Sequence, residues 1–172
     1  RLDILVNNAG ANWGQPYEDF PESAWDRVLD VNVKGVFQLT RRLTDALAAA
    51  GTAETPARVI NTGSIDGLTA PSLETYSYSA SKAAVHHMTR VLAKKLAPRN
   101  ILCNAIAPGP FQSRMMKATL EAAGDAVAGM IPIGRIGSPE DMAGISIFLA
   151  SRAGAYINAT VIPVDGGFSG TR

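Results

Sequence analysis

The sequence predicts an α/β fold with a doubly wound parallel sheet, and three patterns support this prediction. Four short apolar runs recur along the 172 residues, and longer segments with apolar residues three and four positions apart separate them. The short runs are typical of strands covered on both faces, and the longer segments are typical of amphipathic helices. Their order, βαβαβαβ, favours parallel strands joined by helical crossovers.

The expected strands are short, continuous and rich in β-branched residues. They comprise residues 2–6, 58–61, 101–106 and 159–164. Because continuous apolar runs of this length are typical of buried parallel strands, we expect all four to be covered on both faces.

Apolar periodicity supports the expected helices, and residues typical of helix starts and ends support them as well. The helices comprise residues 22–50, 78–96 and 138 to about 151. Gly51 ends the first helix, and Pro98 limits the second because proline cannot continue a helix. Ser138 followed by Pro139 is typical of a helix cap and first turn.

Composition indicates a single globular domain over residues 1–172, because 47% of the residues are hydrophobic and 18% are charged. The formal net charge of +1 gives no electrostatic reason to expect nucleic acid or an anionic membrane as a partner. No apolar stretch approaches the length of a membrane span. The single cysteine, Cys103, lies in an apolar run, which indicates a buried thiol in a reducing cytoplasm.

Polar or turn-forming residues follow three of the expected strands. Asn7 follows the first, Ser64 the second and the pair Pro108-Gly109 the third. In open α/β sheets ligands bind at the carboxyl ends of the strands, so we expect these segments to converge on one site.

Tyr78 and Lys82 carry the clearest chemical signal, because residues four apart on a helix lie on the same face. A phenol with a pKa of about 10 is a poor proton-transfer group near neutral pH. A neighbouring ammonium favours the phenolate, so we expect Lys82 to lower the pKa of Tyr78. Tyr76 lacks this arrangement, since the residue four positions on is Ala80.

Six motifs in their order resemble the short-chain dehydrogenase/reductase family. They are Asn7-Asn-Ala-Gly10, Asn32, Ser64, Tyr78-x-x-x-Lys82, Pro108-Gly109 and Val164-Asp-Gly-Gly167. The resemblance covers nearly the whole chain, and its specificity rests on order and spacing, because Tyr-x-x-x-Lys alone is a weak pattern. It implies a Rossmann-type domain and an oxidoreductase that transfers a hydride between NAD(P)(H) and a carbonyl or secondary alcohol.

The resemblance also implies roles for four residues. Tyr78 would be the acid/base, and Lys82 would tune its pKa and hold the nicotinamide ribose. Ser64 would orient the substrate carbonyl, and Asn32 would support a water that relays protons to the lysine. From the residues alone, Ser64 could instead cap a turn, and a buried Asn32 could be structural.

By the same resemblance the cofactor is NAD or NADP, with NADP favoured. Ser113 stands where the family usually has threonine and keeps the hydroxyl. Ala159 stands where the family usually has glycine, so we expect the turn there to differ in shape. Besides Tyr78 and Lys82, the cofactor contacts implied are Asn7, Ala9 and Gly10 on the adenosine side, and Pro108, Gly109, Phe111 and Ser113 near the nicotinamide.

A glycine-rich phosphate loop, G-x-x-x-G-x-G or G-x-G-x-x-G, follows no predicted strand, and residue 1 is arginine rather than methionine. The family places such a loop after its first strand, where it binds the pyrophosphate. We therefore expect this chain to be the later part of a longer protein whose first βαβαβα part lies upstream. A genuine truncated product is the alternative, and it would expose a hydrophobic strand edge at residues 2–6.

Three functions stay open at this point. The first is an NAD(P)-dependent dehydrogenase or ketoreductase. The second is a non-catalytic or partner-completed domain that cannot hold the dinucleotide alone, and the third is an epimerase or dehydratase that uses the same Tyr–Lys pair. The chain resembles both bacterial 3-oxoacyl thioester reductases and sugar or gluconate dehydrogenases, and nothing in its residues separates these substrates. The family also implies a homodimer or homotetramer.

Two further segments have simple interpretations. His86 and His87 follow Lys82 by one turn, and we interpret them as packing or surface residues, because adjacent helical residues diverge and no set of metal ligands accompanies them. Residues 110–135 form an irregular, helix-containing excursion. Its apolar side chains suit either a lid over a substrate site or ordinary packing.

Overall fold

The sheet has four parallel strands in the computed structural model, which describes residues 1–113 and 116–171. The strands lie side by side in the order β1 (Ile4–Asn7), β2 (Ala57–Thr62), β3 (Ile101–Pro108) and β4 (Val161–Val164). The register places Asn7 opposite Asn61 and Thr62 opposite Ile106. The predicted α/β fold with a parallel sheet is confirmed.

Five α-helices accompany these strands in the described part of the chain. They are α1 (Glu22–Leu29), α2 (Val36–Ala48), α3 (Tyr76–Leu96), α4 (Lys117–Gly129) and α5 (Pro139–Ala150). Short 3-10 turns η1 (Tyr17–Asp19), η3 (Ile65–Gly67), η4 (Ala97–Arg99) and η5 (Arg152–Gly154) lie between them. Helix α4 belongs to the predicted excursion, of which residues 114 and 115 lie outside the described residues.

The helix predicted over residues 22–50 is not uniform. A π-helical segment, η2 (Asp30–Gly35), joins α1 to α2, and Asn32 lies within it. A π-helical turn holds more residues than an α-helical turn and is frequent at functional sites. The segment therefore changes which side chains face the sheet at the position of Asn32.

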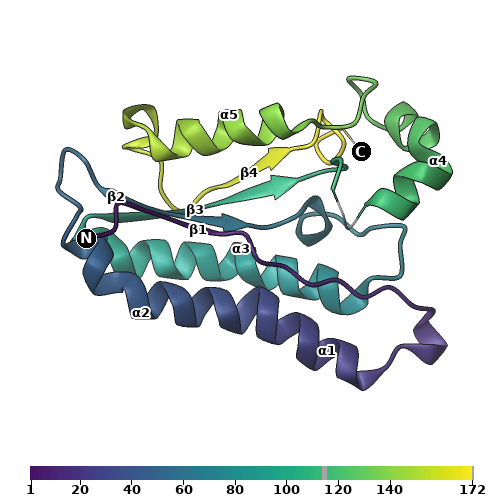
Figure 1. Cartoon of the computed structure of the whole chain (residues 1–172), viewed down its shortest axis with the longest axis horizontal. Helices are drawn as coiled ribbons and strands as arrows, with labels where there is room; N and C mark the ends of the chain where they lie inside the picture. Colours follow the sequence, from purple (N-terminus) through teal and green to yellow (C-terminus); the bar gives the residue numbers. More distant parts are fainter. Residues whose placement is uncertain (114–115, 172) are drawn as a thin grey trace.

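Helices cover both faces of the sheet, with α2 and α3 on one face and α5 on the other (Figure 1). Val59 of β2 packs with the α2 and α3 side, and its neighbour Ile60 packs with the α5 side, because successive strand residues point to opposite faces. Cys103 is fully buried as predicted, and burial raises the pKa of its thiol to about 12.

Strand β1 departs from the prediction that every strand is covered on both faces. Leu5 points toward α2 and α3 and is 8% exposed, whereas Ile4 and Val6 point the other way and are 42% and 50% exposed. Helix α5 packs on β2, β3 and β4 and leaves this part of β1 uncovered. Strand β1, at one edge of this sheet, therefore exposes the apolar side chains of one of its faces to solvent.

The turn before β4 contains a left-handed alanine. Ala159 has a φ of 62°, a conformation that costs an alanine more than a glycine. The side chain of Asn158 accepts a hydrogen bond from the backbone N–H of Cys103 at 2.9 Å, and Asn104 donates to the carbonyl of Ile157 at 2.8 Å. These contacts hold the turn against the first half of β3.

Helix α5 begins as predicted. Ser138 precedes it with extended backbone, Pro139 is its first residue, and the carboxylate of Asp141 accepts from the Ser138 N–H at 2.8 Å. Arg135, at the end of the excursion, donates to the same carboxylate at 2.7 and 2.9 Å. These bonds hold the pKa of Asp141 well below its usual range and fasten the excursion to α5.

Helix α4 lies beyond the carboxyl ends of the strands (Figure 1). The excursion therefore faces the edge of the sheet where the predicted site lies. Among the helices described, none is long and apolar enough to cross a membrane.

Candidate active site

The predicted catalytic residues come from three segments that pack together at one end of the sheet. Ser64 follows β2 with extended backbone and precedes the turn η3, while Tyr78 and Lys82 lie on the first turns of α3. Asn32 comes from the π-helical segment η2, which packs against α3. The structure thus brings together three segments that are separate in the sequence and carry the four predicted residues.

Lys82 is buried beside the ring of Tyr78. Its Nζ lies 5.3 Å from the centroid of the phenol ring and donates to the backbone carbonyl of Thr62 at 2.8 Å. The residue is 4% exposed. Burial lowers the pKa of Lys82 to about 8, against the opposing charge of Asp66. Lys82 therefore titrates near physiological pH.

The pKa of Tyr78 moves in the direction opposite to the one predicted. Burial raises it above the usual value because the phenolate loses solvation, and the negative charge of Asp66 adds to this effect. A hydrogen bond from Ser64 acts to lower it but does not prevail. Lys82 does not reverse the shift, and its ammonium hydrogen-bonds to the Thr62 carbonyl.

Ser64 is fixed through both its backbone and its side chain. Its N–H donates to Nε2 of His86 across 3.4 Å, and its Oγ accepts from the N–H of Asp66 at 3.2 Å. Ser64 is 7% exposed. The serine caps the turn η3, and its side chain also acts on the phenol of Tyr78.

Asn32 uses its side-chain amide inside the protein. Its Nδ2 donates to the Ala11 carbonyl at 2.9 Å and to Oγ of Ser81 at 2.8 Å, and its Oδ1 accepts from the Ala11 N–H at 2.8 Å. Asn32 is 1% exposed, so these bonds satisfy the hydrogen-bonding groups of a buried amide. Asn32 therefore ties the segment after β1 to helix α3, which is a structural role, and the relay role stays a prediction.

The segment after β1 places Gly10 next to two of the catalytic candidates, Asn32 and Lys82. A Cβ added at Gly10 would lie 3.8 Å from Oδ1 of Asn32 and 3.9 Å from Nζ of Lys82, and both Ala9 and Gly10 are exposed. Asn7 differs, because its buried amide donates to Thr40 at 3.1 Å and to Asn61 at 2.8 Å. The side chain of Asn7 therefore stabilises the sheet, and its cofactor contact stays a prediction.

The segment after β3 also lies at the carboxyl ends of the strands, where it packs against the loop after β4. A Cβ at Gly109 would lie 2.7 Å from Cβ of Asp165, so the absence of a side chain there lets the two loops pack together. The Oγ of Ser113 accepts from the Met116 N–H at 3.2 Å. Pro108 ends β3 and is only partly buried.

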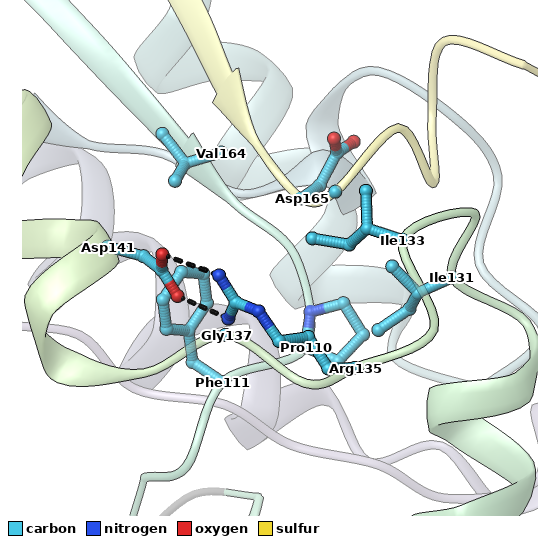
Figure 2. Close-up of a pocket in the computed structure, with 10 residues that line it drawn as sticks. Pro110, Phe111, Ile131, Ile133, Arg135, Gly137, Asp141, Val164 and Asp165 are labelled. Carbon is cyan, nitrogen blue, oxygen red and sulfur yellow. Dashed lines mark hydrogen bonds and ion pairs between the residues drawn. The ribbon is translucent and has the colours of Figure 1, made fainter.

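Phe111 and Pro110 line a small pocket of about 80 Å³ behind this segment (Figure 2). The Phe111 ring packs on Gly137, and the Arg135 guanidinium points toward Asp141. None of the four catalytic candidates lines this pocket. Since sites for small molecules usually measure about 300 Å³ or more, it is a packing feature of the excursion.

Three residues that contribute to the site were not predicted. Asp66 brings a carboxylate close enough to act on both Tyr78 and Lys82. Ser81 orients Asn32, and His86 contacts Ser64. A role for Asp66 could have been suspected from the sequence, because it follows Ser64 by two positions. The contacts of Ser81 and His86 depend on the packing of separate segments, which sequence spacing does not reveal.

The chain matches a known sequence family. A family model described as Enoyl-(Acyl carrier protein) reductase covers residues 1–169. A "Rhamnolipids biosynthesis 3-oxoacyl-[acyl-carrier-protein] reductase" of Pseudomonas aeruginosa is 49% identical over 170 residues, which are 98% of this chain and 66% of that protein. A "2-dehydro-3-deoxy-D-gluconate 5-dehydrogenase" of Pseudoalteromonas atlantica is 35% identical over 176 residues, which cover 99% and 66%.

Solved structures agree with these sequence matches. The chain superposes on RhlG of Pseudomonas aeruginosa, determined as an active-site complex with NADP, at a TM-score of 0.94 and 48% identity, covering 98% of this chain and 67% of RhlG. It superposes on a gluconate 5-dehydrogenase from Burkholderia cenocepacia in complex with NADP and tartrate at 0.91 and 31% identity, covering 99% and 66%. The chain thus spans about two thirds of the length of the curated relatives it matches.

Proposed function

Since this chain belongs to the short-chain dehydrogenase/reductase family, we propose that it supplies the reaction centre of an NAD(P)-dependent oxidoreductase acting on a carbonyl or a secondary alcohol. The observation that carries the proposal is the convergence of Ser64, Tyr78 and Lys82 at one edge of the sheet, with Gly10 beside the lysine. A phenol, an ammonium and a hydroxyl placed together can move a proton to or from a reacting oxygen.

The proposed roles are those that the family implies, and the positions of the side chains support them. Tyr78 donates its proton to the oxygen that becomes the alcohol, and Ser64 holds that oxygen by a hydrogen bond. Lys82 places its ammonium beside the phenol ring and supplies hydrogen-bond donors to its surroundings. A bound nicotinamide supplies or accepts the hydride.

Lys82 also suits the cofactor's ribose. An ammonium has three N–H donors, and among the described residues only the Thr62 carbonyl accepts from it. The remaining donors can bind ribose hydroxyls in the direction of Gly10, where no side chain obstructs the approach. NADP is favoured over NAD because solved relatives were determined with NADP.

A partner-completed domain is the second candidate, and the exposed face of β1 supports it. Ile4 and Val6 are half exposed on the side that α5 does not reach. A partner, or another segment, that covered this face would bury both side chains and would supply a pyrophosphate-binding loop. The isolated chain would then hold the reaction centre without gripping the dinucleotide.

Cofactor titration separates the two candidates. The 172-residue chain and the natural protein are each titrated with NADPH and NADH. Each is then assayed for reduction of a 3-oxoacyl thioester with NADPH and for oxidation of the C5 hydroxyl of 2-dehydro-3-deoxygluconate with NADP⁺. We expect the natural protein to bind NADPH and to turn over one of the two substrates. Tight NADPH binding by the 172-residue chain alone would contradict the partner-completed candidate, and no turnover of either substrate by the natural protein would contradict the proposed reaction for these substrates. The homo-oligomer stays a prediction.

The Asp66→Asn variant tests the electrostatics of the site. Because the Asp66 carboxylate raises the pKa of Tyr78, its removal lowers that pKa, and the phenolate forms at lower pH. Alcohol oxidation needs the phenolate, so the rising limb of its pH–rate profile is expected to move to lower pH. Asp26→Asn, which removes an exposed carboxylate from α1, serves as the control. A limb that stays in place or moves to higher pH would contradict this electrostatic role.

A further inference from the structure

His86 is buried directly behind Ser64, while its neighbour His87 is exposed. The imidazole of His86 is 3% exposed, and its Nε2 accepts a hydrogen bond from the backbone N–H of Ser64 across 3.4 Å. The predicted packing role is therefore incomplete, since this ring contacts the backbone of a residue in the proposed reaction centre.

Two glycines make the space that the ring occupies. A Cβ added at Gly63 would lie 2.1 Å from Nε2 of His86. A Cβ at Gly67 would lie 2.6 Å from the carbonyl carbon of Lys82 on α3 and 2.9 Å from Cε1 of His86. None of these distances is compatible with a side chain in an unshifted structure. Gly63 and Gly67 flank the turn that carries Ser64 and Asp66, so the ring seats both ends of that turn.

The hydrogen bond from Ser64 assigns the tautomer of the neutral ring. Nε2 can accept from an N–H only when its proton is absent, so the neutral ring carries its proton on Nδ1. Burial lowers the pKa of His86, the positive charges of Arg90 and Lys82 act in the same direction, and the backbone of Gly67 opposes them. Nε2 is thus the ring nitrogen that contacts Ser64.

We propose that His86 is a positioning residue that holds the Ser64 turn, and through it the Ser64 hydroxyl, in register with the Tyr78 phenol. The inference rests on the proposed function, because Ser64 matters only if it binds a reacting oxygen. Its Oγ is otherwise held by the N–H of Asp66, which belongs to the same turn. A turn that shifts as a unit would move the hydroxyl, and a displacement of about 1 Å in such a group can cost roughly a hundredfold in rate.

Variants of the two neighbouring histidines test the proposal in the natural protein. His86→Leu fills the space without accepting a hydrogen bond, and His86→Gln places an acceptor close to the position of Nε2. We expect His86→Leu to lower kcat by about tenfold or more, with NADPH affinity unchanged, and His86→Gln to recover most of the loss. His87→Leu, the exposed control, should match the wild type. Equal turnover in His86→Leu and the wild type, or no recovery in His86→Gln, would overturn the proposal.

A double-mutant cycle covers the case in which His86→Leu folds poorly. Gly63→Ala forces its methyl group against Nε2, so we expect it to lower kcat strongly in the wild type and much less in a His86→Ala background. Additive effects of the two substitutions would show that the ring and the Ser64 turn are not coupled, and would overturn the proposal.

The tautomer of His86 provides a readout that does not depend on activity. In nitrogen-15 NMR spectra of the natural protein we expect His86 to carry its proton on Nδ1 and to show an accepting Nε2, and His86→Leu identifies the signal. A proton on Nε2 would overturn the hydrogen bond to Ser64. If the protein reduces no carbonyl at all, the proposed function fails, while this measurement still decides whether His86 holds the serine.

Discussion

The Tyr78→Phe variant is expected to lose turnover by a factor of about 10² to 10⁴ while it keeps its fold and its cofactor affinity. The substitution removes one oxygen, the atom that we propose to donate the proton to the reacting substrate. Tyr78 is mostly buried beside Lys82, so a ring of nearly the same shape should pack in its place. Steady-state kinetics and NADPH titration of the wild type and the variant provide the measurement.

Tyr76→Phe is the matched control. Tyr76 lies two residues earlier on the same helix, and its hydroxyl donates to the exposed carboxylate of Glu74 at 2.8 Å, away from Lys82. This variant should retain turnover close to that of the wild type. Wild-type turnover in Tyr78→Phe, or equal losses in both variants, would remove Tyr78 from its assigned role.

The Lys82→Met variant is expected to lose at least about a hundredfold in turnover and to change how stability depends on pH. In the folded protein the pKa of Lys82 is about 8, against a usual value of 10.5. Below pH 8 the buried charge destabilises the fold by about 3 kcal/mol relative to an unperturbed lysine. A methionine removes this charge and also the hydrogen bond to the Thr62 carbonyl, which offsets about 1–3 kcal/mol of the gain.

The direction of the pH effect follows from proton binding. Between pH 8 and pH 10.5 the unfolded chain binds more protons at Lys82 than the folded one, so wild-type stability rises with pH across this window. Lys82→Met lacks this contribution. Urea unfolding at several pH values should show that the stability of the variant relative to the wild type falls as pH rises through the window.

Lys94→Met is the control for this effect, because Lys94 is exposed on the same helix. Its substitution should leave the stability difference from the wild type nearly constant with pH. If the stability difference between Lys82→Met and the wild type is also constant with pH, the pKa of Lys82 is not lowered in the folded protein.

The sequence predicts the sheet and most helices because apolar periodicity reports burial directly. It does not predict the π-helical segment at Asn32, since the apolar residues around it still recur three and four positions apart. The side chain of Asn7 could have been placed from the sequence, because residues two apart on a strand share a face and Leu5 points into the core. The family resemblance implies a cofactor contact for Asn7, which stays a prediction, whereas the alternation of the strand accounts for the direction of its side chain.

The catalytic candidates could be named from the sequence, but their electrostatics could not. Spacing on a helix puts Tyr78 next to Lys82, and the structure agrees. The raised pKa of Tyr78 depends on how deeply the phenol is buried and on the carboxylate of Asp66, which comes from another segment. His86 shows the same limit, because adjacent helical residues diverge and only packing decides which of the two histidines faces Ser64.

The most direct test of the proposed reaction follows the hydride itself. The natural protein is incubated with the substrate that it reduces and with NADPH that carries deuterium at the transferable position of the nicotinamide, and the product is analysed by mass spectrometry and NMR. The proposed function predicts one deuterium on the carbon that bears the new hydroxyl, with a single configuration at that carbon. A product without deuterium from cofactor labelled on either face would contradict hydride transfer at this site.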